Sequence, residues 1–405
     1  MSHILKLSLT VCLLILINQP LAAQSNDPAG DDRYIVDLTA MEFSFELPSK
    51  IKSGWVTFRF KNEGSLTHVA QILKLEHDLS SAEVDSILQA GDYPATTKVM
   101  GGPGLHSGGE SSEITIQLEP GVYMMVCGTR MKNDIPHFDL GMISHLEVTE
   151  EIGAKEPPTS DVKLTLDNYD IKMDGVLSTG RQTIEIDGNE AAYDVHLIAL
   201  EEESTEAAAF EYFNDLQDPT PVRLYGGVEE GHISYYTVNI KPGDYLLSSH
   251  EYGIWGMHEK FSLSNQGDFT LKDKGTKQQV EIKTADYGIS VPEEISSART
   301  LVTIHNTGNQ DHQLEIWKLQ DGMGSDDWIH WMTSDKKDHE EGHHNHTAEF
   351  PGKGYGITFE SLRPGKEHAL TLELSPGRYV AVCYAENDEG NYHIEEGEIV
   401  EFIVE

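Results

Sequence analysis

The chain has 405 residues, more than one ordinary domain holds, so its length predicts two to four domains that each bury a core of their own. Its 68 Asp and Glu residues against 29 Lys and Arg residues give a net charge of −39. So strong an acidic balance argues against nucleic acid and anionic membranes as partners, and it helps to keep a protein soluble.

Residues 1–23 have the layout of a secretory signal peptide. Lys6 precedes an apolar run over 7–17, and small residues stand at Ala22 and Ala23. The apolar run is too short for a comfortable membrane span, and no later segment offers one. We therefore expect an exported protein, periplasmic or secreted, that does not cross a membrane.

The clearest internal repeat is a Pro-Gly pair followed by one residue and then Tyr. It occurs at 120–123, 242–245 and 376–379. Pro beside Gly marks a turn, and the apolar, β-favouring residues after each Tyr predict a strand. The position four residues past each Tyr holds Cys127, Ser249 and Cys383.

A second marker lies upstream in each repeat. The segments KNEGSLTHVAQILKL and HNTGNQDHQLEIWKL share an Asn-x-Gly turn and a His four residues after that Gly, which aligns His68 with His312. The middle repeat, IDGNEAAYDVHLIAL, places Tyr193 at this position. His196 lies three residues further on and has the opposite strand parity, so it is expected on the other face.

Between the two markers each repeat carries one predicted helix, at 80–90, 205–216 and 326–333. Polar linkers with turn residues fall near 150–161 and 272–281. We therefore predict an all-β chain of three tandem Greek-key β-sandwich domains, each with a short helix. After the signal peptide the predicted domains span 27–150, 160–272 and 278–405.

The loop after the first of the repeated strands holds Cys127, His137 and Met142, with nine residues between Cys and His and four between His and Met. His68 would supply a second imidazole from a neighbouring strand. Two imidazoles and a thiolate with a weak axial thioether hold both copper oxidation states. The set resembles that of the cupredoxins, the plastocyanin and azurin family. The resemblance implies a type 1 copper site with these four ligands, and His137 near the surface as the point of electron entry.

The third repeat has His312, Cys383 and His393, with the same nine-residue gap between Cys and His, and Glu398 where the first repeat has Met142. The segments CGTRMKNDIPHFDLGMI and CYAENDEGNYHIEEGEI align without a gap. A carboxylate is a harder ligand than a thioether, so it favours the oxidised metal and admits zinc. We predict a variant site here, for copper or zinc.

The second repeat has lost the ligand set, so we predict that it binds no copper in this way. It keeps a Gly-Met pair without any ligand Cys or His, which means that a Met at this position is by itself more often a core residue. The site predictions rest on a conjunction, because the only two cysteines after the signal peptide stand at equivalent positions, each with two histidines. The alternative for these thiols is a disulfide joining two domains. The residues of the second repeat at the four ligand positions are Tyr193, Ser249, Tyr252 and Met257.

A His-rich segment at 339–346 lies in an insertion of the third repeat. Clustered imidazoles and carboxylates can capture copper or zinc loosely. The sequence fits a solvated acidic loop without a metal equally well.

Multicopper oxidases also contain three cupredoxin-like domains, and in them and in copper nitrite reductases a His next to the type 1 Cys binds a second copper centre. No His stands next to Cys127 or Cys383, and paired His-x-His motifs for a trinuclear cluster are absent. We therefore assign no catalytic residues and expect no enzyme.

The function predicted from these patterns is one-electron transfer by an exported copper protein. The acidic surface would then steer it toward a basic redox protein of the cytochrome c kind. Two alternatives stay open: a copper-binding or delivery protein, and a metal-free interaction or scaffold module.

Overall fold

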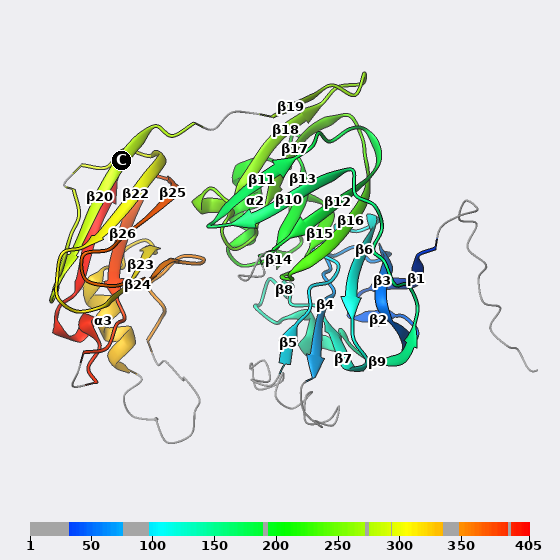
Figure 1. Cartoon of the computed structure of the whole chain (residues 1–405), viewed down its shortest axis with the longest axis horizontal. Helices are drawn as coiled ribbons and strands as arrows, with labels where there is room; N and C mark the ends of the chain where they lie inside the picture. The colour runs from blue at the N-terminus through cyan, green and yellow to red at the C-terminus, as the bar shows by residue number, and fades with distance from the viewer. Residues whose placement is uncertain are drawn as a thin grey trace, which may run out of the picture. The chain divides into compact units, whose positions relative to one another are not determined.

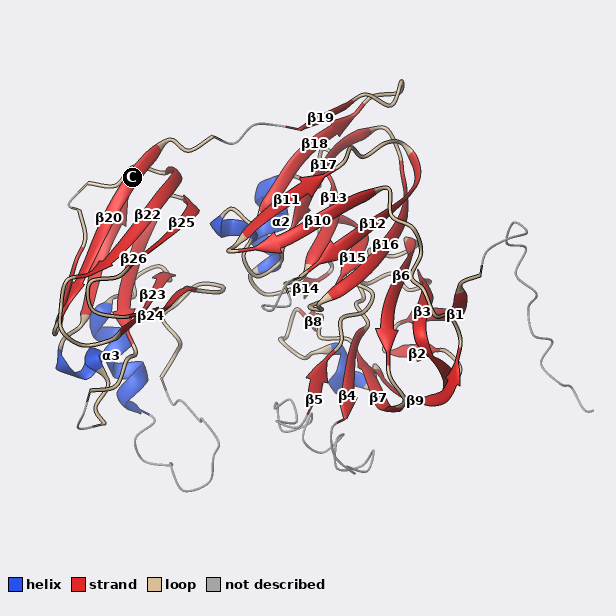
Figure 2. Ribbon diagram, in the orientation of Figure 1, coloured by secondary structure: helices blue, strands red, loops and turns tan. Residues whose placement is uncertain are grey.

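The structure is a computed structural model that describes residues 32–75, 97–188, 193–271, 275–292, 294–334, 348–387 and 390–405. Strands dominate it, as Figure 2 shows in red, and in Figure 1 they gather in three groups that follow one another along the chain. The three groups match the three sandwich domains predicted from the repeats.

The third domain shows the plan most clearly, because two four-stranded sheets form it. One sheet has the order β21-β20-β22-β25 and the other β24-β23-β26-β27. Its elements are β20 (Gln278–Ala285), β21 (Gly288–Ser290), β22 (Ala298–Asn306), β23 (His312–Lys318), α3 (Ser325–Ser334), β24 (Ile357–Leu362), β25 (Glu367–Leu374), β26 (Gly377–Cys383), the 3₁₀ turn η3 (His393–Glu396) and β27 (Ile399–Val404).

The first domain repeats this plan with β2, β1, β3 and β6 in one sheet and β9, β7, β4 and β5 in the other, where β3 also pairs with β9. Its elements are β1 (Tyr34–Met41), β2 (Ser44–Glu46), β3 (Lys50–Asn62), β4 (Gln71–Leu75), β5 (Thr97–Val99), β6 (Ser111–Leu118), β7 (Gly121–Val126), β8 (Arg130–Met131), the 3₁₀ turn η1 (His137–Leu140) and β9 (Ile143–Ile152).

The second domain has the sheets β11-β10-β12-β16 and β15-β13-β17-β18-β19. Its elements are β10 (Val162–Asp167), β11 (Asp170–Asp174), β12 (Gly180–Asp187), β13 (Val195–Ala199), α2 (Glu206–Phe213), β14 (Gln217–Asp218), β15 (Arg223–Val228), β16 (Ile233–Ile240), β17 (Gly243–Ser248), the 3₁₀ turn η2 (Gly253–Trp255), β18 (His258–Leu263) and β19 (Phe269–Leu271).

The strands follow the two-residue period of a sheet with one buried face. In β22 every second residue from Thr300 to Asn306 is buried, and in β20 the same alternation buries Val280, Ile282 and Thr284. β13 differs, because all five of its residues are buried. It is an interior strand of its sheet, between β15 and β17.

The repeated Tyr after each Pro-Gly pair has a structural role. The hydroxyls of Tyr123, Tyr245 and Tyr379 each donate a hydrogen bond to the backbone oxygen of the residue four positions earlier, at 2.8, 2.9 and 2.8 Å. Each bond ties the start of a strand to the turn before it, and the three aromatic rings are buried in the sandwiches. The Pro-Gly-x-Tyr repeat therefore stabilises the hairpin whose second strand leads into each candidate ligand loop.

The first and second domains share a sheet. β16 pairs antiparallel with β6, with Ser234 opposite Ile116 and Thr237 opposite Glu113. Their buried side chains form one continuous apolar cluster. The sequence repeats did not predict this pairing, because both strands have the same pattern as any sandwich strand.

Two of the three predicted helices lie in the described residues. α2 begins after Thr205, whose hydroxyl accepts the Ala208 N–H at 3.1 Å as an N-cap, and it ends at Phe213 rather than at Leu216. α3 is one residue longer at each end than predicted. The predicted helix at 80–90 and the signal peptide at 1–23 lie outside the described residues. Within the described part of the chain, no helix has the length and apolar character that a membrane span requires.

Candidate metal centres

The strand register of each domain sets the position of the loop cysteines. In the first domain β4 pairs with β7 so that Gln71 faces Val126, and in the third β23 pairs with β26 so that Leu314 faces Cys383. Extending both registers places His68 and His312 at equivalent points, which confirms the alignment made from sequence. Cys127 directly follows β7 and Cys383 ends β26, and the histidine of each pair lies two residues before the residue opposite the cysteine.

In the first domain three predicted ligands converge. Cys127 Sγ lies 3.8 Å from His68 Nδ1 and 3.5 Å from His137 Nδ1, and the two imidazole nitrogens are 3.3 Å apart. All three side chains have no exposed surface. Both histidines therefore present the same ring nitrogen, Nδ1, to one point beside the sulfur.

The size of this triangle suits one metal ion. An ion bonded at about 2.0 Å to each nitrogen and about 2.3 Å to the sulfur, in a trigonal plane, requires N–N and N–S separations of about 3.5 and about 3.7 Å. The observed edges of 3.3 to 3.8 Å agree with these values. The chemistry of the donors, thiolate and imidazole, suits copper or zinc.

The protonation states of the two histidines and the cysteine also suit metal binding. Burial lowers the pKa of His68 and of His137 to about 4, so both imidazoles are neutral at pH 7 and keep a lone pair. Burial raises the pKa of the Cys127 thiol to about 11. The sulfur therefore holds its proton unless a cation replaces it, as expected where metal binding releases the thiol proton.

A 3₁₀ turn carries the rest of the ligand loop. His137 begins η1, and the turn ends at Gly141 with a φ of +104°, a conformation that glycine adopts without strain. The Met142 N–H then donates to the His137 oxygen at 3.0 Å, and the Cys127 N–H donates to the Met142 oxygen at 3.3 Å. Met142 is fully buried in the same apolar cluster as Cys127. The loop thus holds all three of its predicted ligands by backbone hydrogen bonds.

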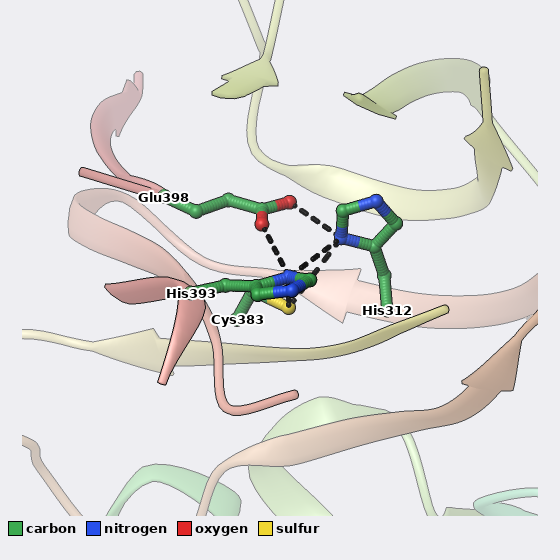
Figure 3. A group of neighbouring side chains, drawn as sticks. All are labelled: His312, Cys383, His393 and Glu398. Carbon is green, nitrogen blue, oxygen red and sulfur yellow. Dashed lines mark hydrogen bonds and ion pairs between the residues drawn. The ribbon is translucent and has the colours of Figure 1, made fainter. Parts of the chain in front are cut away.

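In the third domain four predicted ligands converge (Figure 3). Cys383 Sγ lies 3.6 Å from Nδ1 of His312 and 3.6 Å from Nδ1 of His393, and these nitrogens are 3.3 Å apart. The two Glu398 oxygens lie 2.8 Å from His312 Nδ1 and 3.0 Å from His393 Nδ1. Burial raises the pKa of Cys383 to about 12, with Glu398 adding to the effect. The carboxylate is thus aimed at the same point as the other three donors.

Thr284 is a further residue of this site that sequence reasoning missed. Its hydroxyl donates a hydrogen bond to Glu398, and both side chains are fully buried. The register of β20 on β22 places Thr284 where the first domain has Ala40. Both members of the pair therefore change between the domains: the first domain has Ala40 and Met142, and the third has Thr284 and Glu398. A sequence signal for this exchange was available. The segments VDLTA (36–40) and VEIKT (280–284) align, and each is followed three positions later by an aromatic residue, which places Ala40 opposite Thr284 in the alignment.

In the second domain tyrosines take the place of the histidines. Tyr193 and Tyr252 lie edge to face with ring centroids 5.6 Å apart, and Tyr169 packs against both at 5.7 and 4.9 Å. The Met257 N–H donates to the Tyr252 oxygen at 3.2 Å, and the Ser249 N–H donates to the Met257 oxygen at 3.1 Å. The loop backbone is thus that of the other domains, with a tyrosine cluster at the position of the donors.

One aromatic residue per domain packs beside the ligand loop, and sequence reasoning missed all three. Phe43, Tyr169 and Tyr287 have φ values of +59°, +58° and +68°. The Phe43 ring lies 5.2 Å from the His137 ring, and the Tyr287 ring lies 6.0 Å from the His393 ring. Because non-glycine residues rarely adopt positive φ, three equivalent cases indicate a shared structural requirement of the site.

A third group of possible ligands, Asp194, His196 and His250, lies in the second domain. Asp194 Oδ2 lies 2.8 Å from His196 Nε2 and 2.9 Å from His250 Nδ1. The Leu105 N–H donates to His196 Nδ1 at 3.2 Å, which leaves the proton of the neutral ring on Nε2, without a lone pair for a metal. Burial would lower the pKa of His250, but Asp194 outweighs it and raises this pKa to about 10. We therefore interpret the group as an ion-pair network.

Two expectations for the cysteines and His137 can be compared with the structure. Neither Cys127 nor Cys383 forms a disulfide. His137 was expected near the surface, and this is wrong, because its side chain has no exposed surface and Asp218 of the second domain covers it. The His-rich segment 339–346 lies outside the described residues.

Similar folds occur among solved structures. The reduced auracyanin of the photosynthetic bacterium Roseiflexus castenholzii matches 32% of this chain and 99% of its own, at 19% identity and a TM-score of 0.22. Auracyanin A, a blue copper protein of Chloroflexus aurantiacus, matches 29% of this chain and 99% of its own at 21% identity and a TM-score of 0.21. The copper-containing nitrite reductase of Thermus scotoductus matches 92% of this chain and 99% of its own at 12% identity and a TM-score of 0.17. Identities of 12 to 21% and TM-scores of 0.17 to 0.22 are too low for these matches to assign a function to this chain. No protein-family model and no curated protein matches the chain.

Proposed function

We propose that this chain is an exported copper protein that transfers single electrons through the centre of its first domain. The observation that carries the proposal is the convergence of His68 Nδ1, His137 Nδ1 and Cys127 Sγ within 3.8 Å of one another, in a site without solvent exposure. Copper bound there would supply one-electron cycling between its two oxidation states. Met142 would be the axial ligand.

The protein's part in this function is to hold the donors rigidly and to exclude water. The backbone bonds of Met142 to His137 and of Cys127 to Met142 fix the loop, so the donors need not rearrange when the charge at the site changes. Because His137 is covered, we place the entry of the electron at Phe43. The Phe43 ring is partly exposed and packs edge-on against the imidazole.

We assign a different role to the third domain's site, at His312, Cys383, His393 and Glu398. A hard carboxylate so close to both histidines favours Cu(II) over Cu(I), and it suits zinc equally. This site would therefore be a lower-potential copper site or a zinc site. The same observation supports a second candidate function, copper binding and delivery, in which redox change is incidental.

We further propose that the protein is a carrier rather than an enzyme, with a basic redox protein as its partner. Val126 and Gly128 flank Cys127, so no adjacent imidazole leads to a second copper. The net charge of −39 would speed encounter with a basic partner, in a manner that weakens with salt.

Metal loading of the full chain and of two cysteine variants tests the proposal. The copper-loaded chain should show an intense visible band from thiolate to Cu(II), and reversible bleaching on reduction. Cys127→Ser should lose the band of the first site and one metal per chain. Cys383→Ser should lose one metal and keep the band of the first site. Ser249→Ala, at the equivalent position of the second domain, should change neither.

The outcomes separate the candidates. Stoichiometric Cu(I) uptake without the visible band would favour delivery over electron transfer. Absence of stoichiometric metal after loading would overturn both copper functions and leave the interaction module. The metal content of Cys127→Ser would identify the ion preferred by the third domain.

A further inference from the structure

The two ring nitrogens of His137 have different surroundings. Nδ1 faces Cys127 and His68, so it is the nitrogen that would bind the metal. Nε2 lies on the other side of the ring, is fully buried, and forms no hydrogen bond within the described residues. If Nδ1 binds a metal, the proton of the neutral imidazole must be on Nε2. That N–H therefore points away from the metal into the protein.

The side chain that Nε2 faces belongs to the second domain. Asp218 Oδ2 lies 3.8 Å from His137 Nε2, and neither side chain has exposed surface. Asp218 comes from β14, which pairs with β8 inside the ligand loop, with Asp218 opposite Met131. A backbone bond of 3.1 Å from the Arg130 N–H to the Leu216 oxygen extends this pairing. The second domain is thus hydrogen-bonded to the loop that carries His137.

Asp218 is held from a second direction. Its Oδ2 accepts the Thr67 N–H at 3.0 Å, and Thr67 precedes the ligand His68 in the chain. Its other oxygen, Oδ1, is buried and forms no hydrogen bond among the described residues. One carboxylate therefore contacts both segments that supply imidazoles. A buried carboxylate with spare acceptor capacity beside an imidazole N–H is an electrostatically complementary pair.

The separation decides how the carboxylate acts. At 3.8 Å it is longer than a direct hydrogen bond, so Asp218 acts on the ring mainly as a negative charge in a site of low dielectric. Negative charge beside the imidazole N–H makes the ring a stronger donor at Nδ1, which favours Cu(II) over Cu(I). Outer carboxylates of this kind also fix the orientation of ligand histidines.

The third domain provides an internal comparison. His393 presents Nδ1 to Cys383 and His312 with nearly the same distances as His137 in the first domain. Its Nε2 is buried as well, but among the described residues no carboxylate lies within ion-pair distance of that nitrogen. Asp218 is therefore specific to the first site, and its source is the domain that has lost its own ligands.

We propose that Asp218 is a positioning residue of the first domain's copper site, which it tunes through His137. This inference rests on the proposed function. It gives the ligand-free second domain a role, namely to cover His137 and to supply the charge that sets the potential of the neighbouring site.

The test is the reduction potential of Asp218→Asn in the full chain carrying Cys383→Ser, so that only the first site gives a visible band. The amide keeps an acceptor for Thr67 but removes the charge. The preference for Cu(II) over Cu(I) should fall about tenfold, a rise in potential of about 59 mV. Asp215→Asn, which removes an exposed charge three residues away, should leave the potential unchanged.

The outcomes distinguish the inference from the function on which it rests. If the Cys383→Ser parent shows no visible copper band, the proposed function fails. If the parent shows the band and Asp218→Asn has the potential of Asp215→Asn, the positioning role is overturned and the function stands.

A second variant covers the case in which Asp218→Asn does not fold. Asp218→Ser in the same background also removes the charge, so its potential should rise in the same direction. A potential equal to that of Asp215→Asn would overturn the proposal.

Discussion

The two candidate centres have the same backbone conformation and differ in single side chains. The first domain has Ala40 and Met142 where the third has Thr284 and Glu398, and a hydrogen bond joins the latter pair. The hydroxyl donates to Oε1 of a carboxylate that burial would otherwise penalise. With this bond in place, Oε1 lies beside His312 and Oε2 lies beside His393. Replacing a soft thioether by a hard carboxylate at the predicted axial position therefore goes together with a second change, from Ala40 to Thr284.

Thr284→Val tests this pairing, because it removes the hydroxyl and keeps the shape of the side chain. Without its partner Glu398 loses a fixed orientation, so metal affinity at the third site should fall about 10- to 100-fold. Competition with a chromophoric chelator in the Cys127→Ser background measures it. Thr303→Val, in the neighbouring strand β22, is the matched control and should have the parent's affinity.

The candidate ligand residues could be identified from sequence, whereas the residues that surround them could not. Cys127 and His137 recur as Cys383 and His393 at one spacing, and His68 and His312 follow the same Asn-x-Gly turn; such patterns are visible without a structure. Asp218 carries no such sign, since its contact with His137 depends on how two domains pair. The same reason explains why His137 was wrongly expected at the surface.

At the scale of elements, the ligand loop is a 3₁₀ turn that ends on a glycine with positive φ in all three domains. Gly141, Gly256 and Gly397 have φ values of +104°, +108° and +102°. The conformation places the following residue, which is Met142, Met257 or Glu398, back against the strand that carries the Cys or Ser. The turn survives in the second domain without any ligand histidine, so it is a structural feature of the fold before it is part of a site.

Gly397→Ala measures what this conformation contributes. A methyl group at Gly397 would meet no atom within 4 Å, so the expected destabilisation of about 1–2 kcal/mol comes from the positive φ alone. Chemical denaturation of the metal-free protein measures it. Gly288→Ala is the control, since a methyl group there also meets no atom within 4 Å but its φ is not in this region. Equal stability of the two variants would contradict the argument.

Element type was predictable because the two-residue alternation of strands and the turn residues are local signals. Element ends were less so. α2 stops at Phe213 because the chain turns at Leu216, which has a φ of +47° in the segment leading to β14. No residue in the predicted range 205–216 is a breaker, so the sequence pattern continues where tertiary pairing ends the helix.

At the scale of the whole molecule, the second domain has a buried ion-pair network, whereas the other two domains have candidate metal sites. Glu251 lies beside the His250 and Asp194 pair, and burial raises the pKa of Glu251 to about 8. His250 has its pKa raised to about 10 by Asp194, against the effect of burial. Both groups bind their proton more tightly in the folded state than in the unfolded state.

Above about pH 6.5, where the buried His68 and His137 are neutral in the folded and the unfolded state, the stability of the metal-free protein should therefore fall as the pH rises. The contribution of Glu251 is lost up to about pH 8, and that of His250 is lost between 6.5 and about pH 10. Denaturant unfolding above pH 6.5 should show a loss of stability on the order of 1 kcal/mol. Glu251→Gln should reduce this loss, whereas Glu202→Gln, at an exposed position, should leave it unchanged. Stability that rises with pH above 6.5 would contradict the assignment.

The pairing of β6 with β16 has a consequence for how this chain can be divided. Cut free from the second domain, the first would end in an open strand edge at Glu113 to Ile116, with unpaired N–H and C=O groups next to apolar side chains. Open edges of this kind recruit strands from other molecules and lead to aggregation. The smallest fragment containing the first candidate metal site that remains monomeric should therefore include the second domain, whether or not that domain binds a metal itself.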